Sequence, residues 1–237
     1  MPWNDQIFRY CERGQDPSFW AEPLNAITNG AFLIAALAAA MELYRRPDRT
    51  RRWVEALLIA LVAVIGIGSF LFHTYATRWA AVADTAPIGL FMVGYLVYAL
   101  RRYLALNWIV VGLLLGGFIW SLQVAGNIQC RPGLLSVTAA ARGPCLNGTV
   151  GYAPALFAML GIGALLGFLR HLAWRYLMAA GIVFLVSMFF RTVDLEVCAS
   201  TLVAGRRQGV HFLWHLLNAT TLYILLLAAI RHGQAQD

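Results

Sequence analysis

The chain has 237 residues, of which 60% are hydrophobic and only 12% are charged, and its formal net charge is +7. This number of charged groups is too small to cover a water-soluble globule of this size. The composition therefore excludes an ordinary soluble domain and favours an integral membrane protein. All 18 basic residues are arginine and they mark the ends of apolar stretches, so we expect no nucleic-acid partner.

Seven apolar stretches are long enough to cross a hydrocarbon layer about 30 Å thick as helices, each of which needs roughly 17 to 25 residues. We therefore expect an all-α bundle of seven transmembrane helices that forms one domain over residues 1–237. The expected helices cover residues 24–43, 54–73, 84–100, 105–124, 152–170, 173–190 and 209–230. Residues 1–22 are expected to form an extramembrane segment without signal-peptide features, and residues 125–151 a long outer loop.

The start of the first helix carries a polar stripe. Glu22, Asn25 and Asn29 follow the spacing i, i+3 and i+7, which places them on one helical face. Asn218 lies on the polar face of the seventh helix. These side chains either hold the tautomers of nearby histidines or form ordinary hydrogen bonds between helices, and the spacing allows both.

The loop after the first helix contains the densest basic run of the chain. Its members are Arg45, Arg46, Arg49, Arg51 and Arg52. The positive-inside rule places this loop in the cytoplasm, so the N-terminus is expected outside and the C-terminus inside.

With this orientation all four cysteines lie on the outer side, where an oxidising compartment permits disulfides. Four cysteines allow three pairings. Because Cys130 and Cys145 share one loop, we favour a Cys130–Cys145 bridge with Cys11–Cys198 as the second. Four free thiols are the alternative.

Ionisable side chains occur near the ends of the second, third and seventh helices. His73 ends the second helix in GIGSFLFHT, Asp84 opens the third in VADTAP, and His211 and His215 open the seventh in GVHFLWHLLNAT. Chain direction alternates with each crossing, so these helix ends lie at the same membrane face. We therefore expect these four residues to meet. Ionisable groups inside a membrane are costly, so the four residues are also functional candidates.

The three histidines suit a metal ion. His211 and His215 are spaced i, i+4, which presents two imidazoles from one helical face, and His73 supplies a third. Three neutral imidazoles leave the fourth position of a tetrahedral zinc site open for water, whose pKa the metal lowers to about 7. The alternative for each histidine alone is a hydrogen-bonded or interfacial side chain.

Two further polar groups accompany these histidines. Ser69 precedes His73 by one helical turn, where its hydroxyl can donate to a developing oxyanion or orient the water. Asp84 can take a proton from that water and return it to the leaving amine. The alternatives are a serine bonded to its own helix and an aspartate that caps a helix. Arg191, Asp194 and Glu196, beyond the sixth helix, are expected to form a solvated ion-pair cluster.

Over nearly its full length the sequence resembles the alkaline ceramidase family. The segments that carry the resemblance are YCER, FWAEPLNAITN, GIGSFLFHT, VADTAP and GVHFLWHLLNA. The resemblance implies a zinc ion held by His73, His211 and His215. It also implies that Ser69 and Asp84 assist the attack of water on the ceramide amide, which yields sphingosine and a fatty acid.

The same resemblance implies a calcium site near the N-terminus. Glu12 and Glu22 match two of its carboxylates, but Arg9 and Gly14 stand where the family pattern has an aspartate and an asparagine. The match to the calcium site is therefore incomplete. A disulfide between the N-terminal segment and the loop before helix seven, here Cys11–Cys198, is also implied.

We interpret the chain as a zinc-dependent hydrolase of a linear amide bond in ceramide or a related N-acyl lipid. We expect it in a bacterial inner membrane, with the active site near the outer face and no obligate protein partner. The alternatives are a receptor-like protein of the progestin and adiponectin receptor type, which shares the seven helices and three histidines, and a proton-coupled transporter. A retinal protein is excluded because the chain has no lysine for a Schiff base.

Overall fold

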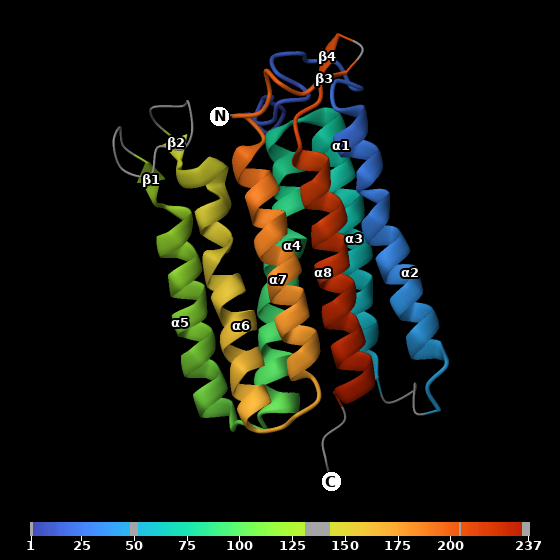
Figure 1. Cartoon of the computed structure of the whole chain (residues 1–237), viewed down its shortest axis with the longest axis vertical. Coiled ribbons are helices and arrows are strands. Elements are labelled where there is room, and N and C mark those ends of the chain that lie inside the picture. The colour runs from blue at the N-terminus through green and yellow to red at the C-terminus, as the bar shows by residue number, and fades with distance from the viewer. Residues whose placement is uncertain (1, 48–51, 131–142, 204, 234–237) are drawn as a thin grey trace.

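The computed structural model describes residues 2–47, 52–130, 143–203 and 205–233. Within these residues, seven helical spans are long and apolar enough to cross a membrane, which confirms the expected all-α bundle (Figure 1). The helices are α1 (Pro23–Thr28), α2 (Gly30–Tyr44), α3 (Trp53–Tyr75), α4 (Arg78–Tyr98), the π-helical η2 (Ala99–Tyr103), α5 (Trp108–Gly126), the 3-10 helix η3 (Cys145–Tyr152), α6 (Ala153–Phe168), α7 (Trp174–Val193) and α8 (His211–His232). Two small antiparallel pairs, β1 (Gln129–Cys130) with β2 (Gly143–Pro144) and β3 (Leu202–Val203) with β4 (Arg206–Arg207), lie in the loops at one end.

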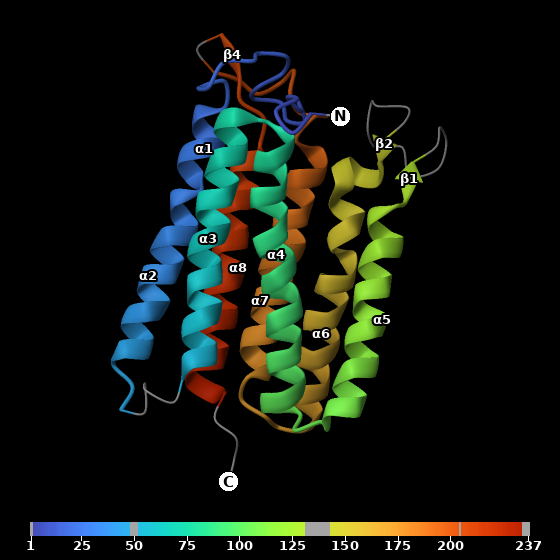
Figure 2. The same cartoon turned by 180° about the vertical axis from the view of Figure 1, so that it is seen from behind.

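Helix α8 lies inside the bundle, where it packs against α2, α3 and α7, while α5 and α6 form one side (Figures 1 and 2). The outward faces of the helices carry large apolar side chains, such as Ile109, Leu113 and Phe157, which are exposed by 70% or more. Such faces are stable only against lipid, since water would disfavour this much apolar surface.

Helices α3 and α4 approach each other closely at Gly68. A Cβ atom on Gly68 would overlap the backbone carbonyl of Ala83 on α4. Glycine lets two helix backbones come this near, as small residues commonly do in membrane bundles. Ser69 and Asp84, the next residue on each helix, are thereby brought side by side.

The N-terminal segment crosses the end of the bundle where α3 ends and α8 begins. Both favoured disulfides are present, and Cys11–Cys198 joins this segment to the loop before α8, while Cys130–Cys145 joins β1 to the start of η3. Residues 131–142 of the expected loop 125–151 lie outside the described residues. The described ends of that loop belong largely to α5 and η3.

Helix α4 begins six residues earlier than expected, so the prediction that Asp84 opens or caps this helix is wrong. The N-cap position is Thr77, and Asp84 lies in the second turn. The cause lies in the N-terminal segment, whose backbone carbonyls at Trp3 and Asp5 accept the N–H groups of Trp79 and Arg78. These bonds satisfy free donors of the first turn, so the helix starts outside the apolar window that hydropathy detects.

Candidate functional site

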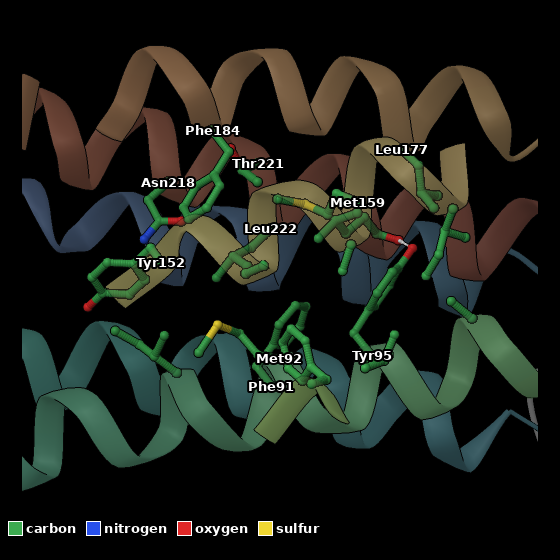
Figure 3. A pocket seen from close by; sticks show the side chains of 18 of the residues that line it. Phe91, Met92, Tyr95, Tyr152, Met159, Leu177, Phe184, Asn218, Thr221 and Leu222 are labelled. Carbon is green, nitrogen blue, oxygen red and sulfur yellow. Dashed lines mark hydrogen bonds between the residues drawn. The ribbon is translucent and has the colours of Figure 1, made fainter. Parts of the chain in front are cut away.

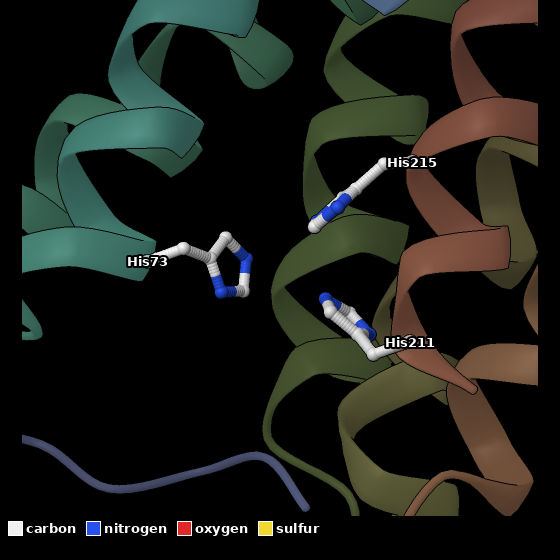
Figure 4. Close-up of side chains that lie close together, drawn as sticks. All are labelled: His73, His211 and His215. Carbon is white, nitrogen blue, oxygen red and sulfur yellow. The ribbon is translucent and has the colours of Figure 1, made fainter. Parts of the chain in front are cut away.

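Three histidines converge at the end of the bundle beneath the N-terminal segment (Figure 4). His73 comes from the last turn of α3, and His211 and His215 come from the first two turns of α8. Each residue is only 1% exposed. One ring nitrogen from each histidine can be chosen so that the three nitrogens all lie within 4.8 Å of one another. The alternation of chain direction with each membrane crossing therefore predicted correctly which helix ends meet.

Hydrogen bonds orient two of the three rings. Nδ1 of His73 lies 2.5 Å from Oε2 of Glu22, and Nδ1 of His215 lies 3.0 Å from the hydroxyl oxygen of Thr28. The Thr28 hydroxyl hydrogen is already directed to backbone carbonyls of α1, so its oxygen accepts from His215. With Nδ1 protonated in both rings, each Nε2 keeps a free lone pair, as a metal ligand requires.

His211 is held by stacking. The Tyr10 ring lies against it with a centroid separation of 3.8 Å and an interplanar angle of 19°. Its Nδ1 atom is buried and has no hydrogen-bond partner among the described residues. A buried nitrogen without a partner is costly, and a metal ion bound at Nδ1 would remove that cost. The donor set and this unsatisfied atom both fit a tetrahedral site for zinc.

Ser69 and Asp84 lie beside the histidine cluster. Ser69 is 4% exposed and sits one turn before His73 on α3, and the close approach of Gly68 to Ala83 brings it next to Asp84 on α4. Both side chains line the same polar pocket as His211 and His215. The structure therefore brings together the four ionisable residues that the sequence singled out, with Ser69 among them.

The three asparagines differ in their contacts. Asn25 donates to Oε2 of Glu22 at 3.1 Å, so it supports the carboxylate that orients His73. Asn29 donates to the backbone carbonyl of Asn25 at 2.8 Å, which is a bond within its own helix segment. Asn218 lines the polar pocket one turn beyond His215.

Glu12 and Glu22 are both engaged by protein donors. Glu12 accepts the backbone N–H groups of Leu24 and Asn25, at 2.7 and 2.8 Å, at the start of α1. Glu22 accepts from Nε of Arg13 at 2.6 Å in addition to His73. Burial acts to raise the pKa of Glu22, but the His73 ring and the hydrogen bonds outweigh it, so this pKa lies below its ordinary value.

Arg13 fills the oxygen-rich space beside Glu22. Its side chain is fully buried, and besides Glu22 its guanidinium donates to four backbone carbonyls, those of Asp16, Ser18, His73 and Thr74, at 2.9 to 3.1 Å. One cation thus already occupies the cluster of oxygens that a second cation would need. The described residues do not fit a calcium ion at Glu12 and Glu22.

The expected solvated cluster beyond the sixth helix is not solvated. Helix α7 continues through Val193, and Asp194 is 1% exposed and accepts the backbone N–H groups of Cys11, Val210 and His211 at 2.8 to 3.0 Å. Burial raises the pKa of Asp194, and the three N–H donors oppose this. Asp194 therefore ties the start of α8 to the N-terminal segment, because the first N–H groups of a helix need outside acceptors.

An apolar cavity lies next to the polar pocket, inside the bundle. The two share Ile65, Ile88, Tyr152 and Asn218 in their walls. Figure 3 shows Tyr152 and Asn218 at one end of this cavity and Tyr95 and Leu177 at the other. A polar compartment beside the histidines thus adjoins an apolar one.

Sequence reasoning missed Thr28, Tyr10 and Arg13. Thr28 follows Asn25 by three residues, so the polar stripe of the first helix contained a signal for it. Tyr10 and Arg13 lie in a segment without regular structure, where no periodicity indicates which way a side chain points.

The fold and site define a seven-helix membrane protein with a buried three-histidine centre at one end of the bundle. A comparison with protein families finds a match to the family described as Ceramidase over residues 8–143, which is more than half of the chain. The chain belongs to the ceramidase family. The matched region includes Ser69, His73 and Asp84 but ends before α8. A search among curated proteins finds no match.

Proposed function

We propose that this protein is a zinc-dependent membrane amidohydrolase that cleaves the amide bond of ceramide or a related N-acyl lipid. The observation that carries the proposal is a cluster of three buried histidines beside a polar pocket that Ser69 and Asp84 line and that shares wall residues with an apolar cavity. Membership in the ceramidase family supports an amide hydrolase acting on a lipid in a bilayer.

His73, His211 and His215 would hold the metal. A zinc ion bound there supplies a Lewis acid and lowers the pKa of a coordinated water to about 7. Glu22 and Thr28 keep the rings of His73 and His215 in the ligand tautomer.

Asp84 is the group placed to move protons. Its carboxylate accepts a proton from the attacking water and delivers it to the nitrogen of the leaving amine. Ser69 lines the same polar pocket as Asp84, where its hydroxyl can orient the attacking water or donate to the developing oxyanion. The apolar cavity would hold the acyl chain and exclude water from it.

We further propose that the enzyme needs no calcium, because the Arg13 guanidinium takes the place of a cation beside Glu22. The chain would work in a bacterial inner membrane with the histidine end of the bundle toward the outer face, as the arginine distribution predicts.

The test is metal content and amide cleavage of the detergent-purified protein, measured with ceramide and other N-acyl lipids. We expect one zinc per chain and release of fatty acid, and loss of both in His215→Ala. His232→Ala is the matched control, since His232 lies at the opposite end of α8. A His215→Ala protein that retains stoichiometric zinc, or a zinc-loaded wild type that cleaves no N-acyl lipid, would contradict the proposal.

A further inference from the structure

Two guanidinium groups line the polar pocket beside the histidines. Arg9 comes from the N-terminal segment and is exposed, and Arg191 comes from the last turn of α7. Among the described residues that line this pocket, Asp84 carries the opposing charge. Two positive groups and one negative group leave the pocket with a net charge of +1 when the histidines are neutral, and a bound metal ion would add to it.

Arg191 has no carboxylate partner. Within the described parts of the chain no carboxylate lies at ion-pair distance from it. Its guanidinium donates to the Tyr10 hydroxyl at 3.1 Å and lies 5.1 to 5.8 Å from the ring centres of Tyr10, Tyr152 and Trp214. Its Nε atom is buried and finds no acceptor among these residues. Arg191 is partly buried, and a cation that has lost part of its water is more stable with a counter-ion, because desolvation is costly.

Arg13 shows that this fold can satisfy a buried arginine completely. Its guanidinium is surrounded by the Glu22 carboxylate and four backbone carbonyls. The neighbours of the Arg191 guanidinium are instead aromatic rings and the hydroxyl group of Tyr10. Its Nε–H group has no acceptor among the described residues. Arg191, the residue that carries this unsatisfied donor, lines the polar pocket together with His211, His215 and Asp84.

The position of Arg191 determines which part of a lipid it would meet. Tyr10, which receives its hydrogen bond, stacks on His211, and Trp214 precedes His215 in the chain. The apolar cavity extends the other way, along α8 from Asn218 to Leu225. With the acyl chain in that cavity and the amide at the histidines, the amine portion of the lipid would face Arg191 and Arg9.

We propose that the amine portion of the N-acyl lipid substrate carries an acidic oxyanion, a phosphate, sulfonate or carboxylate, which Arg191 binds with help from Arg9. This inference rests on the proposed amidohydrolase function. Guanidinium forms paired, charge-assisted hydrogen bonds with such groups, and an anion would supply the acceptor that the Arg191 Nε lacks. The neutral hydroxyl groups of a plain ceramide would leave this cation unpaired.

Hydrolysis of matched lipids tests the proposal. The kcat/KM values of N-palmitoyl taurine and N-palmitoyl ethanolamine phosphate are compared with that of neutral N-palmitoyl ethanolamine. We expect the wild type to favour both anionic lipids by about tenfold or more, as one charge-assisted bond provides. In Arg191→Gln the anionic-to-neutral ratio should fall toward one, and Arg191→Lys should retain part of it. Arg207→Gln, an exposed arginine in β4 outside the pocket, is the matched control and should keep the ratio.

A binding measurement separates this proposal from the proposed function. Hexadecyl phosphate and hexadecanol contain no amide, so their stabilisation of the zinc-loaded protein against heat does not depend on catalysis. Preferential stabilisation by the phosphate that is lost in Arg191→Gln supports the anion site, even if no amide is ever cleaved. Equal kcat/KM values for anionic and neutral lipids, an unchanged ratio in Arg191→Gln, or an effect of the variant only on inhibition by free palmitate would overturn the proposal. Palmitate inhibition alone would assign Arg191 to the carboxylate product.

Discussion

Gly68→Ala is the sharpest structural test of how α3 and α4 place the Ser69–Asp84 pair. A Cβ atom on Gly68 would overlap the backbone oxygen of Ala83, and a backbone atom cannot rotate away as a flexible side chain can. The helices must separate, and overpacking of this kind costs about 1 to 3 kcal/mol. Against this, alanine is favoured over glycine inside a helix by only about 0.5 to 1 kcal/mol.

The matched control is Gly89→Ala on α4, where the added Cβ meets nothing within 4 Å. We expect Gly89→Ala to be neutral or slightly stabilising and Gly68→Ala to lower the thermal unfolding midpoint in detergent. Separation of α3 from α4 should also move Ser69 away from Asp84, so kcat should fall while zinc content is retained. A Gly68→Ala protein with the stability and kcat of the Gly89→Ala control would show that the close approach of α3 and α4 is wrong.

Three further outcomes are expected. Asp84→Asn should retain zinc and lower kcat by about 10²- to 10⁴-fold, as loss of a general base does, and an active variant would end this role. A chelator selective for calcium should change neither activity nor thermal stability, and calcium-dependent activity of the wild type would contradict this. Arg13→Ala should destabilise the fold by about 3 to 5 kcal/mol, because Oε1 of Glu22 and four backbone carbonyls lose their buried cationic donor. Tyr95→Ala should lengthen the apolar cavity and shift the acyl preference to longer chains, by about fourfold in relative kcat/KM for each further methylene buried; an unchanged preference would place the acyl chain elsewhere.

The sequence by itself determined the architecture and the meeting of the histidines. Hydropathy alone specifies seven spans, because each apolar helix must satisfy its backbone in lipid and cross a layer of known thickness. The number of crossings then decides which helix ends share a face, so His73, His211 and His215 could be brought together without any coordinates. Membership of Cys130 and Cys145 in one loop was enough to pair the cysteines correctly.

The tertiary structure alone decided the surroundings of those residues. Which acceptor meets Nδ1 of His73 depends on the path of an irregular N-terminal segment, which no periodicity describes. The sequence therefore left Glu22 open as a histidine partner or a calcium ligand, and the fold places it at His73. The same segment supplies carbonyls that extend α4 outward and place Asp84 in its second turn. Hydropathy locates a charged residue along a helix but not its neighbours across the bundle, so only the folded chain shows Arg13 enclosed by oxygens and Arg191 enclosed by aromatic rings at the pocket.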